Sequence, residues 1–181
     1  MRQFSVANSP ICYGFDFCDK TLTLYDDGET KINTSTWLQC GRAVANLLAL
    51  KILPEDENDK SVTISHFFNQ SLYISSFLIS QKEMLASILR VTGAQESDWK
   101  ITRQPSIDRF REGFEMVKSG DRQGFVQAMY SRTFFKDGSG NYEQHGLLAN
   151  DLLGLPKEDL DECTREAVKL VESGKPAYHT A

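Results

Sequence analysis

Apolar and hydroxyl residues alternate at positions 21–25, and this alternation predicts a β-strand. The Asp-Asp-Gly-Glu segment at 26–29 predicts a tight turn after it, because Asp and Gly tolerate the left-handed backbone of a hairpin turn. The hydroxyl residues 34–36 are candidate N-caps of a helix that runs to about Leu50. Its apolar positions fall at helical spacing and comprise Trp37, Cys40, Val44, Leu47 and Leu48.

Two nearly identical strand-like runs follow at 61–65 and 71–75, after an acidic run at 55–59. Two arrangements fit these runs. Either they form a hairpin around 66–70, or only one joins the main sheet and the other lies in an inserted loop. The acidic run lacks the fixed Gly and the closing Glu of an EF-hand, so we interpret it as a solvated loop rather than a calcium site.

The rest of the chain is predicted to be mostly helical. Ser80 and Glu83 form a capping box that begins a helix, and Gly93 ends it. A short strand is predicted at 99–102 and a Gly-bearing loop at 136–141. Four further helices are predicted, the first with Ile107, Phe110, Phe114 and Val117, the second with Phe125 and Met129, and the others at 147–153 and 158–172. Six helices and three or four strands without a domain boundary predict one mixed α/β domain.

Composition and charge exclude several classes of protein. Hydrophobic residues make up 40% of the 181 residues and charged residues 25%, which is ordinary for a globular domain. The net charge of −5 gives no sign of the clustered basic face of a nucleic-acid binder. The longest apolar stretch, 43–53, is interrupted by Asn46 and Lys51, so no membrane-spanning helix is predicted.

The sequence is typical of a cytoplasmic protein. Residues 1–17 lack the apolar core of a secretory signal peptide. The four cysteines stand at 12, 18, 40 and 163, without the close spacing of a zinc site or a redox pair. Reduced thiols are therefore expected, and Cys40, on the apolar face of its helix, is predicted to be a buried thiol.

Local catalytic motifs are absent from the sequence. It contains no Gly-rich phosphate loop, no His-Glu-x-x-His motif and no Gly-x-Ser-x-Gly motif. The histidines, His66, His145 and His179, have no metal-ligand spacing. His145 is the best candidate for proton exchange near neutral pH, because it follows a Gly-bearing loop beside Tyr142 and Glu143. The alternative is an exposed or helix-capping histidine.

Aromatic residues form a stripe in the C-terminal half of the chain. Two interpretations fit the stripe: it lines an apolar ligand pocket, or it packs into the core, as its helical spacing already favours. The residues concerned are Phe110, Phe114, Phe125, Phe134 and Phe135.

Three short sequence segments occur in a particular order along the chain. The first is the strand and Asp-Asp-Gly-Glu turn, followed by 33–36 and by Gly-Arg-Ala-Val at 41–44. The second is Tyr-Ile-Ser-Ser-Phe at 73–77, followed by 80–85, and the third is 146–156. In this order they resemble fungal members of the NmrA-like family, atypical short-chain dehydrogenases that include the isoflavone reductase-like proteins.

The resemblance implies a domain at 14–172, an unassigned segment at 1–13 and a loose tail at 173–181. The stretch 61–70 is extra relative to the family pattern and is interpreted as an insertion. The implied fold class is α/β. The chain would be the C-terminal, helix-rich substrate-binding part of a Rossmann-type NAD(P)-binding fold, with only the last few strands present.

The function that the resemblance implies is NADP-dependent hydride transfer to a small organic substrate, such as a secondary metabolite. The family's Gly-rich turn and its catalytic Lys or Tyr have no counterpart here, so no catalytic, cofactor-binding or metal residue is assigned. We expect the chain alone to be inactive and not to bind NADP. The alternative is a non-catalytic regulator that acts through a protein partner. The candidate substrate-binding residues are Phe110, Phe114, Tyr130, Phe134, Phe135, Tyr142 and His145.

A sheet with only its last strands leaves an edge uncovered. Self-association or docking of a protein partner through this edge is therefore expected. The apolar face of the helix that begins near Trp37 would also have too little sheet to cover it. This exposure predicts a poorly soluble or oligomeric chain.

Overall fold

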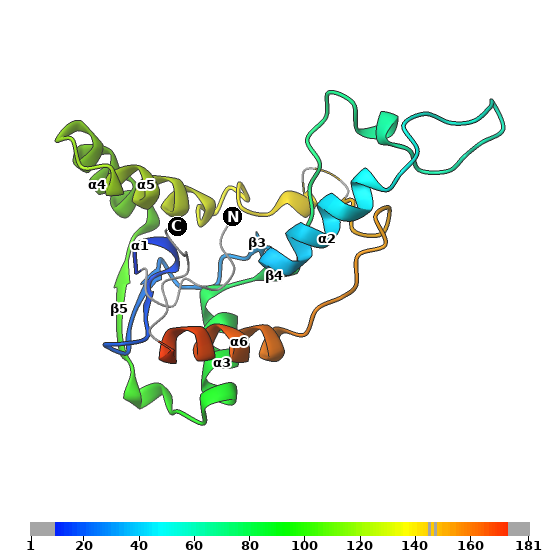
Figure 1. Cartoon of the computed structure of the whole chain (residues 1–181). Coiled ribbons are helices and arrows are strands. Elements are labelled where there is room, and N and C mark those ends of the chain that lie inside the picture. Colours follow the sequence, from blue (N-terminus) through cyan, green and yellow to red (C-terminus); the bar gives the residue numbers. More distant parts are fainter. Residues whose placement is uncertain (1–9, 145, 147, 174–181) are drawn as a thin grey trace.

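A computed structural model describes residues 10–144, 146 and 148–173 of the chain (Figure 1). The described helices are α1 (Pro10–Tyr13), α2 (Trp37–Leu48), α3 (Gln81–Thr92), α4 (Ser106–Lys118), α5 (Gln123–Thr133) and α6 (Leu160–Glu172). The strands are β1 (Phe15–Asp16), β2 (Thr21–Tyr25), β3 (Ile32–Thr34), β4 (Phe77–Ile79) and β5 (Lys100–Gln104). Short 3₁₀ helices are η2 (Ile64–Phe67), η3 (Glu96–Asp98) and η4 (Tyr142–Gln144). The predicted mixed α/β class is confirmed.

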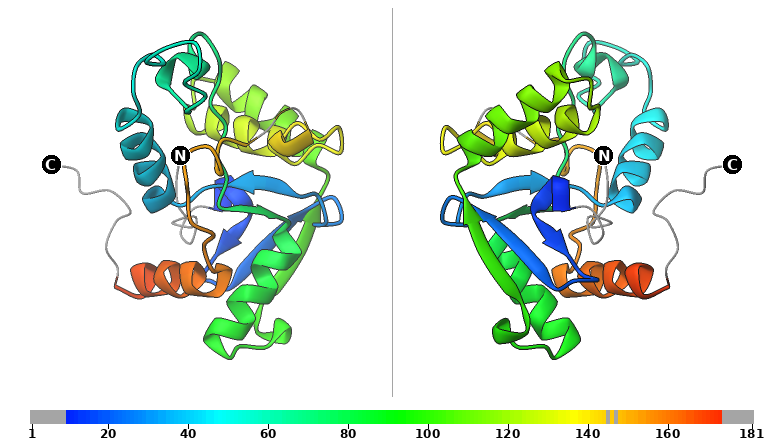
Figure 2. Two further views of the ribbon diagram at one scale, coloured as in Figure 1. Left: turned by 90° about the vertical axis from the view of Figure 1, so that its right-hand side faces the viewer. Right: turned by 90° about the vertical axis from the view of Figure 1, so that its left-hand side faces the viewer.

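Strands β1, β2 and β5 form one sheet in that order. Strand β1 runs antiparallel to β2, whereas β2 and β5 are parallel, with Leu22 opposite Ile101. Strands β3 and β4 form a separate antiparallel pair. Figure 2 shows the strands between α4 and α5 on one side and α3 and α6 on the other. Parallel neighbours need a long crossover, which the chain supplies through α2 and α3.

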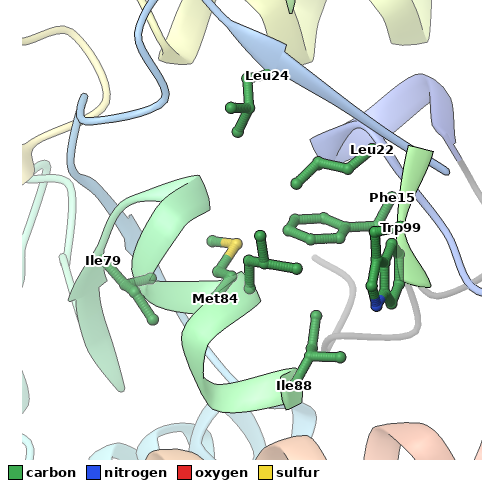
Figure 3. Packing of buried hydrophobic residues seen from close by; sticks show 8 residues of the cluster. Phe15, Leu22, Leu24, Ile79, Met84, Ile88 and Trp99 are labelled. Carbon is green, nitrogen blue, oxygen red and sulfur yellow. The ribbon is translucent and has the colours of Figure 1, made fainter. Parts of the chain in front are cut away.

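The largest apolar core lies between α3 and the three-stranded sheet (Figure 3). Its buried residues are Phe15, Leu22, Leu24, Ile79, Met84, Leu85, Ile88 and Trp99. The predicted capping box is confirmed: Ser80 Oγ accepts from the amide of Glu83, whose carboxylate accepts from the amide of Ser80 at 2.9 Å. Gly93 ends α3 at a φ of +69°, in the left-handed region that favours glycine.

The hairpin, one of the two arrangements predicted for 61–75, does not form. Residues 64–67 form η2, and 71–75 belong to no helix or strand. The backbone of the second run is paired differently: the amide of Ser75 donates to Asn150 Oδ1 at 3.0 Å, and Asn150 Nδ2 donates to the carbonyl of Ser75 at 2.6 Å. The side chain of Asn150 thus binds the backbone of the second run where a neighbouring strand would bind it. Neither run joins a sheet.

The predicted helix at 147–153 is also wrong. Residue 147 lies outside the described residues, and 148–153 form a bend and turns. The amide of Ala149 donates to the carbonyl of Tyr73 at 2.8 Å, which ties this segment to another part of the chain instead of to a helical ladder. The last helix begins at Leu160, after the N-cap Asp159. Apart from its first residues, the predicted helix at 158–172 is confirmed.

Cys40 is only half-buried, so the prediction of a buried thiol is wrong. The inward positions of α2 are instead occupied by Gln39 and Ala43. Burial still raises the pKa of the Cys40 thiol above its usual value. Among the described residues, no helix is long and apolar enough to cross a membrane.

Asp161 fastens α6 to α3, and we expect this contact to depend on pH. Its carboxylate accepts from Arg90 Nη2 and from Ser87 Oγ, both at 2.6 Å, and these bonds lower the pKa of Asp161 to about 2. A carboxylate whose pKa is lower in the folded than in the unfolded chain stabilises the fold at a pH above its unfolded pKa of about 3.9. This contribution disappears as the pH falls toward 2. Asp161→Asn should therefore lower Tm at pH 7 but not near pH 2, as followed by circular dichroism.

The control for this prediction is Asp108→Asn, because Asp108 pairs with Arg111 on the exposed surface of a single helix. Such a pair contributes little to stability. An equal loss of Tm in Asp161→Asn at both pH values would show that the carboxylate charge is not what joins α3 to α6.

Candidate functional site

A cavity of about 300 Å³ opens between α1, β3, α5 and η4. We call it the tyrosine pocket, because three tyrosines stand among its lining residues. The lining comprises Tyr13, Ile32, Asn33, Thr34, Ser35, Ile74, Met129, Tyr130, Thr133, Gly140 and Tyr142. None of these side chains is charged, and the described lining combines aromatic faces with hydroxyl and amide groups. Such a mixture suits a ligand that is apolar and neutral with a few polar atoms.

The three tyrosines of the pocket are held by ring contacts. The rings of Tyr13 and Tyr130 meet edge to face, with centroids 5.3 Å apart. The ring of Tyr142 packs on Tyr73 at 5.4 Å. Burial raises the pKa of Tyr13 well above its usual value, and the neighbouring phenol of Tyr130 adds to the effect. Tyr13 therefore stays protonated and can donate a hydrogen bond at any physiological pH.

A buried layer behind the pocket fixes the position of Tyr13. Phe134, which is only 1% exposed, meets the ring of Tyr13 at 6.0 Å and that of Tyr25 at 5.0 Å. The guanidinium of Arg109 lies over the Tyr25 ring, 5.0 Å from its centroid, and donates to the carbonyls of Pro10 and Ile11. Arg109 thereby holds α1, and with it Tyr13, against the core.

Asn33 links the pocket's β3 wall to η4. Its Oδ1 accepts from the amide of Tyr142 at 2.6 Å. Its Nδ2 donates to Ser75 Oγ at 2.9 Å and to Glu143 Oε1 at 3.0 Å. Because every polar atom of the Asn33 side chain is engaged, this residue positions Tyr142 and is not itself available to a ligand.

The structure places only part of the predicted substrate wall at this pocket. Tyr130 and Tyr142 line it, and Phe134 lies behind it. Phe110 instead meets Phe114 at 4.9 Å and Phe135 at 5.4 Å, in a separate aromatic group. This group does not contribute to the lining of the pocket. His145 lies outside the described residues.

The core-packing interpretation of the aromatic stripe holds for Phe134 but not for its exposed members. Phe134 is buried, whereas Phe114 and Phe125 are 50% and 64% exposed. Sequence reasoning missed Tyr13 and Asn33 as site residues. Tyr13 stands in a segment without periodicity, and Asn33 gains its role through a partner 109 positions away.

A second cavity of about 530 Å³ lies between α2 and α6, with Glu158 and Cys163 in its lining. The Glu158 carboxylate accepts from Thr36 Oγ1 at 2.8 Å, from Ser76 Oγ at 2.5 Å and from Arg42 Nη1 at 3.0 Å. Burial, and next the charge of Glu158, raise the pKa of Cys163 to about 11. A protonated thiol is a poor nucleophile, so Cys163 is not a candidate nucleophile. No cluster of metal-binding side chains occurs in the described part of the chain.

Comparisons with known proteins give one informative match. No protein-family model matches the chain, and no solved structure matches it. The chain is 24% identical over 156 residues to the oxidoreductase aprR of Aspergillus flavus. The match covers 86% of the chain but 47% of the relative, so the chain spans about half the length of the curated protein that it matches. The chain is therefore a distant relative of an oxidoreductase.

Proposed function

We propose that the chain is the substrate-binding part of an NmrA-like, NADP-dependent oxidoreductase, and that the tyrosine pocket holds a neutral organic substrate with one or two rings. The uncharged aromatic lining is the observation that carries the proposal. A volume of about 300 Å³ is at the low end for ligand pockets, which limits the ligand to roughly two rings. The distant oxidoreductase relative supports the reaction class.

In this proposal the chain recognises the substrate, and the cofactor's phosphates are bound elsewhere. A helix N-terminus or Gly-rich loop with free amides is a common binding site for a cofactor's phosphates. The N-terminus of α4 is already occupied, because Asp26 accepts from the amide and the hydroxyl of Ser106. Within the pocket, the hydroxyl of Tyr13 would donate a hydrogen bond to an oxygen of the substrate. The rings of Tyr130 and Tyr142 would contact the substrate's ring.

Calorimetric titration with 2-naphthol and 2-naphthoate tests the proposal. The two probes have the same rings and differ in charge, so the uncharged pocket should bind 2-naphthol at least tenfold more tightly. Tyr13→Phe removes one hydrogen-bond donor and should lower the affinity for 2-naphthol about fivefold to tenfold. Tyr73→Phe is the matched control, because Tyr73 packs on Tyr142 but does not line the cavity.

Two results would contradict the proposal. Equal affinity for the neutral and the charged probe would show that the lining does not select ligands. NADPH bound to this chain in the micromolar range, rather than no tighter than roughly millimolar, would place the phosphate site within these residues.

A further inference from the structure

A further cavity of about 250 Å³ lies where the end of α3, the turn between β1 and β2, and α6 meet. We call it the tryptophan pocket, because Trp99 forms part of its wall. The described lining comprises Phe17, Lys20, Thr92, Ala94, Trp99, Val168, Val171 and Glu172. It shares no residue with the described lining of the tyrosine pocket, and α3 and α6 lie on the other side of the strands from α5 (Figure 2). A ligand of this cavity would therefore be separate from the substrate proposed above.

The indole N–H of Trp99 is a buried hydrogen-bond donor without an acceptor in the described part of the chain. Trp99 is 8% exposed, and its Nε1 finds no hydrogen-bond partner among the described residues. Figure 3 shows this nitrogen at the end of the indole that is turned toward α6, which supplies another wall of the cavity. A buried tryptophan normally places its N–H against an acceptor, because an unpaired donor destabilises the fold. The orphaned N–H of Trp99 therefore marks a position for an acceptor atom.

Ring contacts hold the Trp99 indole in a fixed orientation. It meets the ring of Phe15 edge to face with centroids 6.2 Å apart, and the ring of Phe17 edge to face at 5.4 Å. Phe15 and Trp99 both belong to the core between α3 and the three-stranded sheet. A rotation that brought the N–H to water would disrupt this packing. The donor thus points in one direction, as a group that recognises a ligand must.

A single water molecule is a poor partner for this donor. A buried water needs about two to four polar partners. The hydroxyl of Thr92 is already engaged, because it donates to the carbonyl of Ile88 at 2.8 Å and accepts from the amide of Ala94 at 3.3 Å. Within the described lining, the indole N–H and the exposed Lys20 are then the remaining side-chain donors. The rest of the wall beside the indole is apolar and suits an organic ligand better than water.

We propose that the tryptophan pocket binds a small neutral carbonyl compound with one ring, whose oxygen accepts a hydrogen bond from Trp99 Nε1. The indole N–H is a donor only, so the ligand atom beside it must be an acceptor. A volume of about 250 Å³ is just below the usual range of ligand pockets, which limits the ligand to about one ring. The charged lining residues, Lys20 and Glu172, are exposed and of opposite sign, so the site favours no net charge.

Proton–nitrogen correlation NMR on the ¹⁵N-labelled full chain tests the proposal. The probes are acetophenone and α-methylstyrene, which have the same shape but carry C=O and C=CH₂ at the same place. The chain has two tryptophans, and Trp37→Phe identifies the indole signal of Trp99. Acetophenone should move the Trp99 indole proton downfield, as a new hydrogen bond does, and should saturate with a Kd on the order of 1 mM. The hydrocarbon probe should give no such downfield shift.

A substitution that fills the cavity provides the second measurement. Ala94→Leu places a larger side chain in the wall of the tryptophan pocket and should raise the Kd for acetophenone at least tenfold. The matched control is Ala86→Leu, the same change at an exposed position of α3 outside the described lining, and it should leave the Kd unchanged. Circular dichroism establishes that both variants keep their helix content.

Three results would overturn the proposal. The first is an unchanged Trp99 indole signal at about 10 mM acetophenone, as expected if water alone occupies the cavity. The second is an equal downfield shift with α-methylstyrene, which would show that the N–H does not recognise the oxygen. The third is an Ala94→Leu chain that binds acetophenone as tightly as the parent. None of these results bears on the tyrosine pocket, which is tested separately by 2-naphthol and Tyr13→Phe.

Discussion

Replacing Gln81 by leucine is expected to lower the free energy of unfolding by about 3–9 kcal/mol. Gln81 is fully buried at the start of α3, and its amide joins three backbone groups. Nε2 donates to the carbonyls of Tyr13 at 2.8 Å and Thr23 at 2.9 Å, and Oε1 accepts from the amide of Tyr25 at 2.7 Å. Leucine has a similar volume but no polar atom, so all three groups would be left unpaired in the core.

Each unpaired buried group costs about 1–3 kcal/mol, and a domain of this size has only about 5–15 kcal/mol in total. Urea denaturation of Gln81→Leu measures the loss. Lys82→Ala is the matched control on the next residue, whose side chain reaches only the exposed Glu29, and it should change stability by less than about 1 kcal/mol. A loss below about 1 kcal/mol in Gln81→Leu would show that water enters and satisfies these groups.

Gln81→Leu should also weaken ligand binding in the tyrosine pocket. One of the three groups that Gln81 binds is the carbonyl of Tyr13, so the contact holds the end of α1 to the β2–α3 core. Arg109 holds the preceding carbonyls from the other side. Loss of 2-naphthol binding in Gln81→Leu under conditions where the chain remains folded would support this link.

Local signals in the sequence were sufficient for the elements that do not depend on distant contacts. Strand β2, its turn and the caps of α3 were predicted correctly, because alternation, a Ser-to-Glu capping box and a Gly stop act within a few residues. The runs at 61–65 and 71–75 have an equally clear alternation but form no strand. In the second run, the Asn150 side chain binds the backbone of Ser75, and no local pattern reveals a partner 75 positions away.

The extent of helix α2 was predicted from the sequence. Which of its faces points inward was not, because that depends on contacts with distant parts of the chain. Periodicity locates an apolar stripe but does not say what covers it. The polar residues Gln39 and Asn46 turn inward because carbonyls at 153 and 156 offer them partners. The residues of the candidate site were likewise only partly predictable from local sequence. Tyr130 stands on a predicted helix and reaches the pocket, whereas Tyr13 and Asn33 reach it through contacts between segments that are far apart in sequence.

Replacing Gly113 by alanine is expected to destabilise the chain by about 3 kcal/mol, because α4 and α5 cross at this residue. A Cβ on Gly113 would lie 2.7 Å from the amide nitrogen of Ala128 and 2.7 Å from the carbonyl oxygen of Gly124, both backbone atoms of α5. Backbone atoms in a helix cannot rotate away as a side chain can. The added methyl group must therefore push the two helices apart along their whole contact.

The matched control is Gly41→Ala, the same change in the interior of another helix. A Cβ on Gly41 meets nothing within 4 Å. Alanine is favoured over glycine in a helix by about 1 kcal/mol, so this variant should be slightly stabilised while Gly113→Ala is strongly destabilised. Urea denaturation of both variants measures the difference. A Gly113→Ala chain as stable as the parent would mean that α4 and α5 are farther apart in solution, and the tyrosine pocket, whose wall includes Met129 and Tyr130 of α5, would then be wider than 300 Å³.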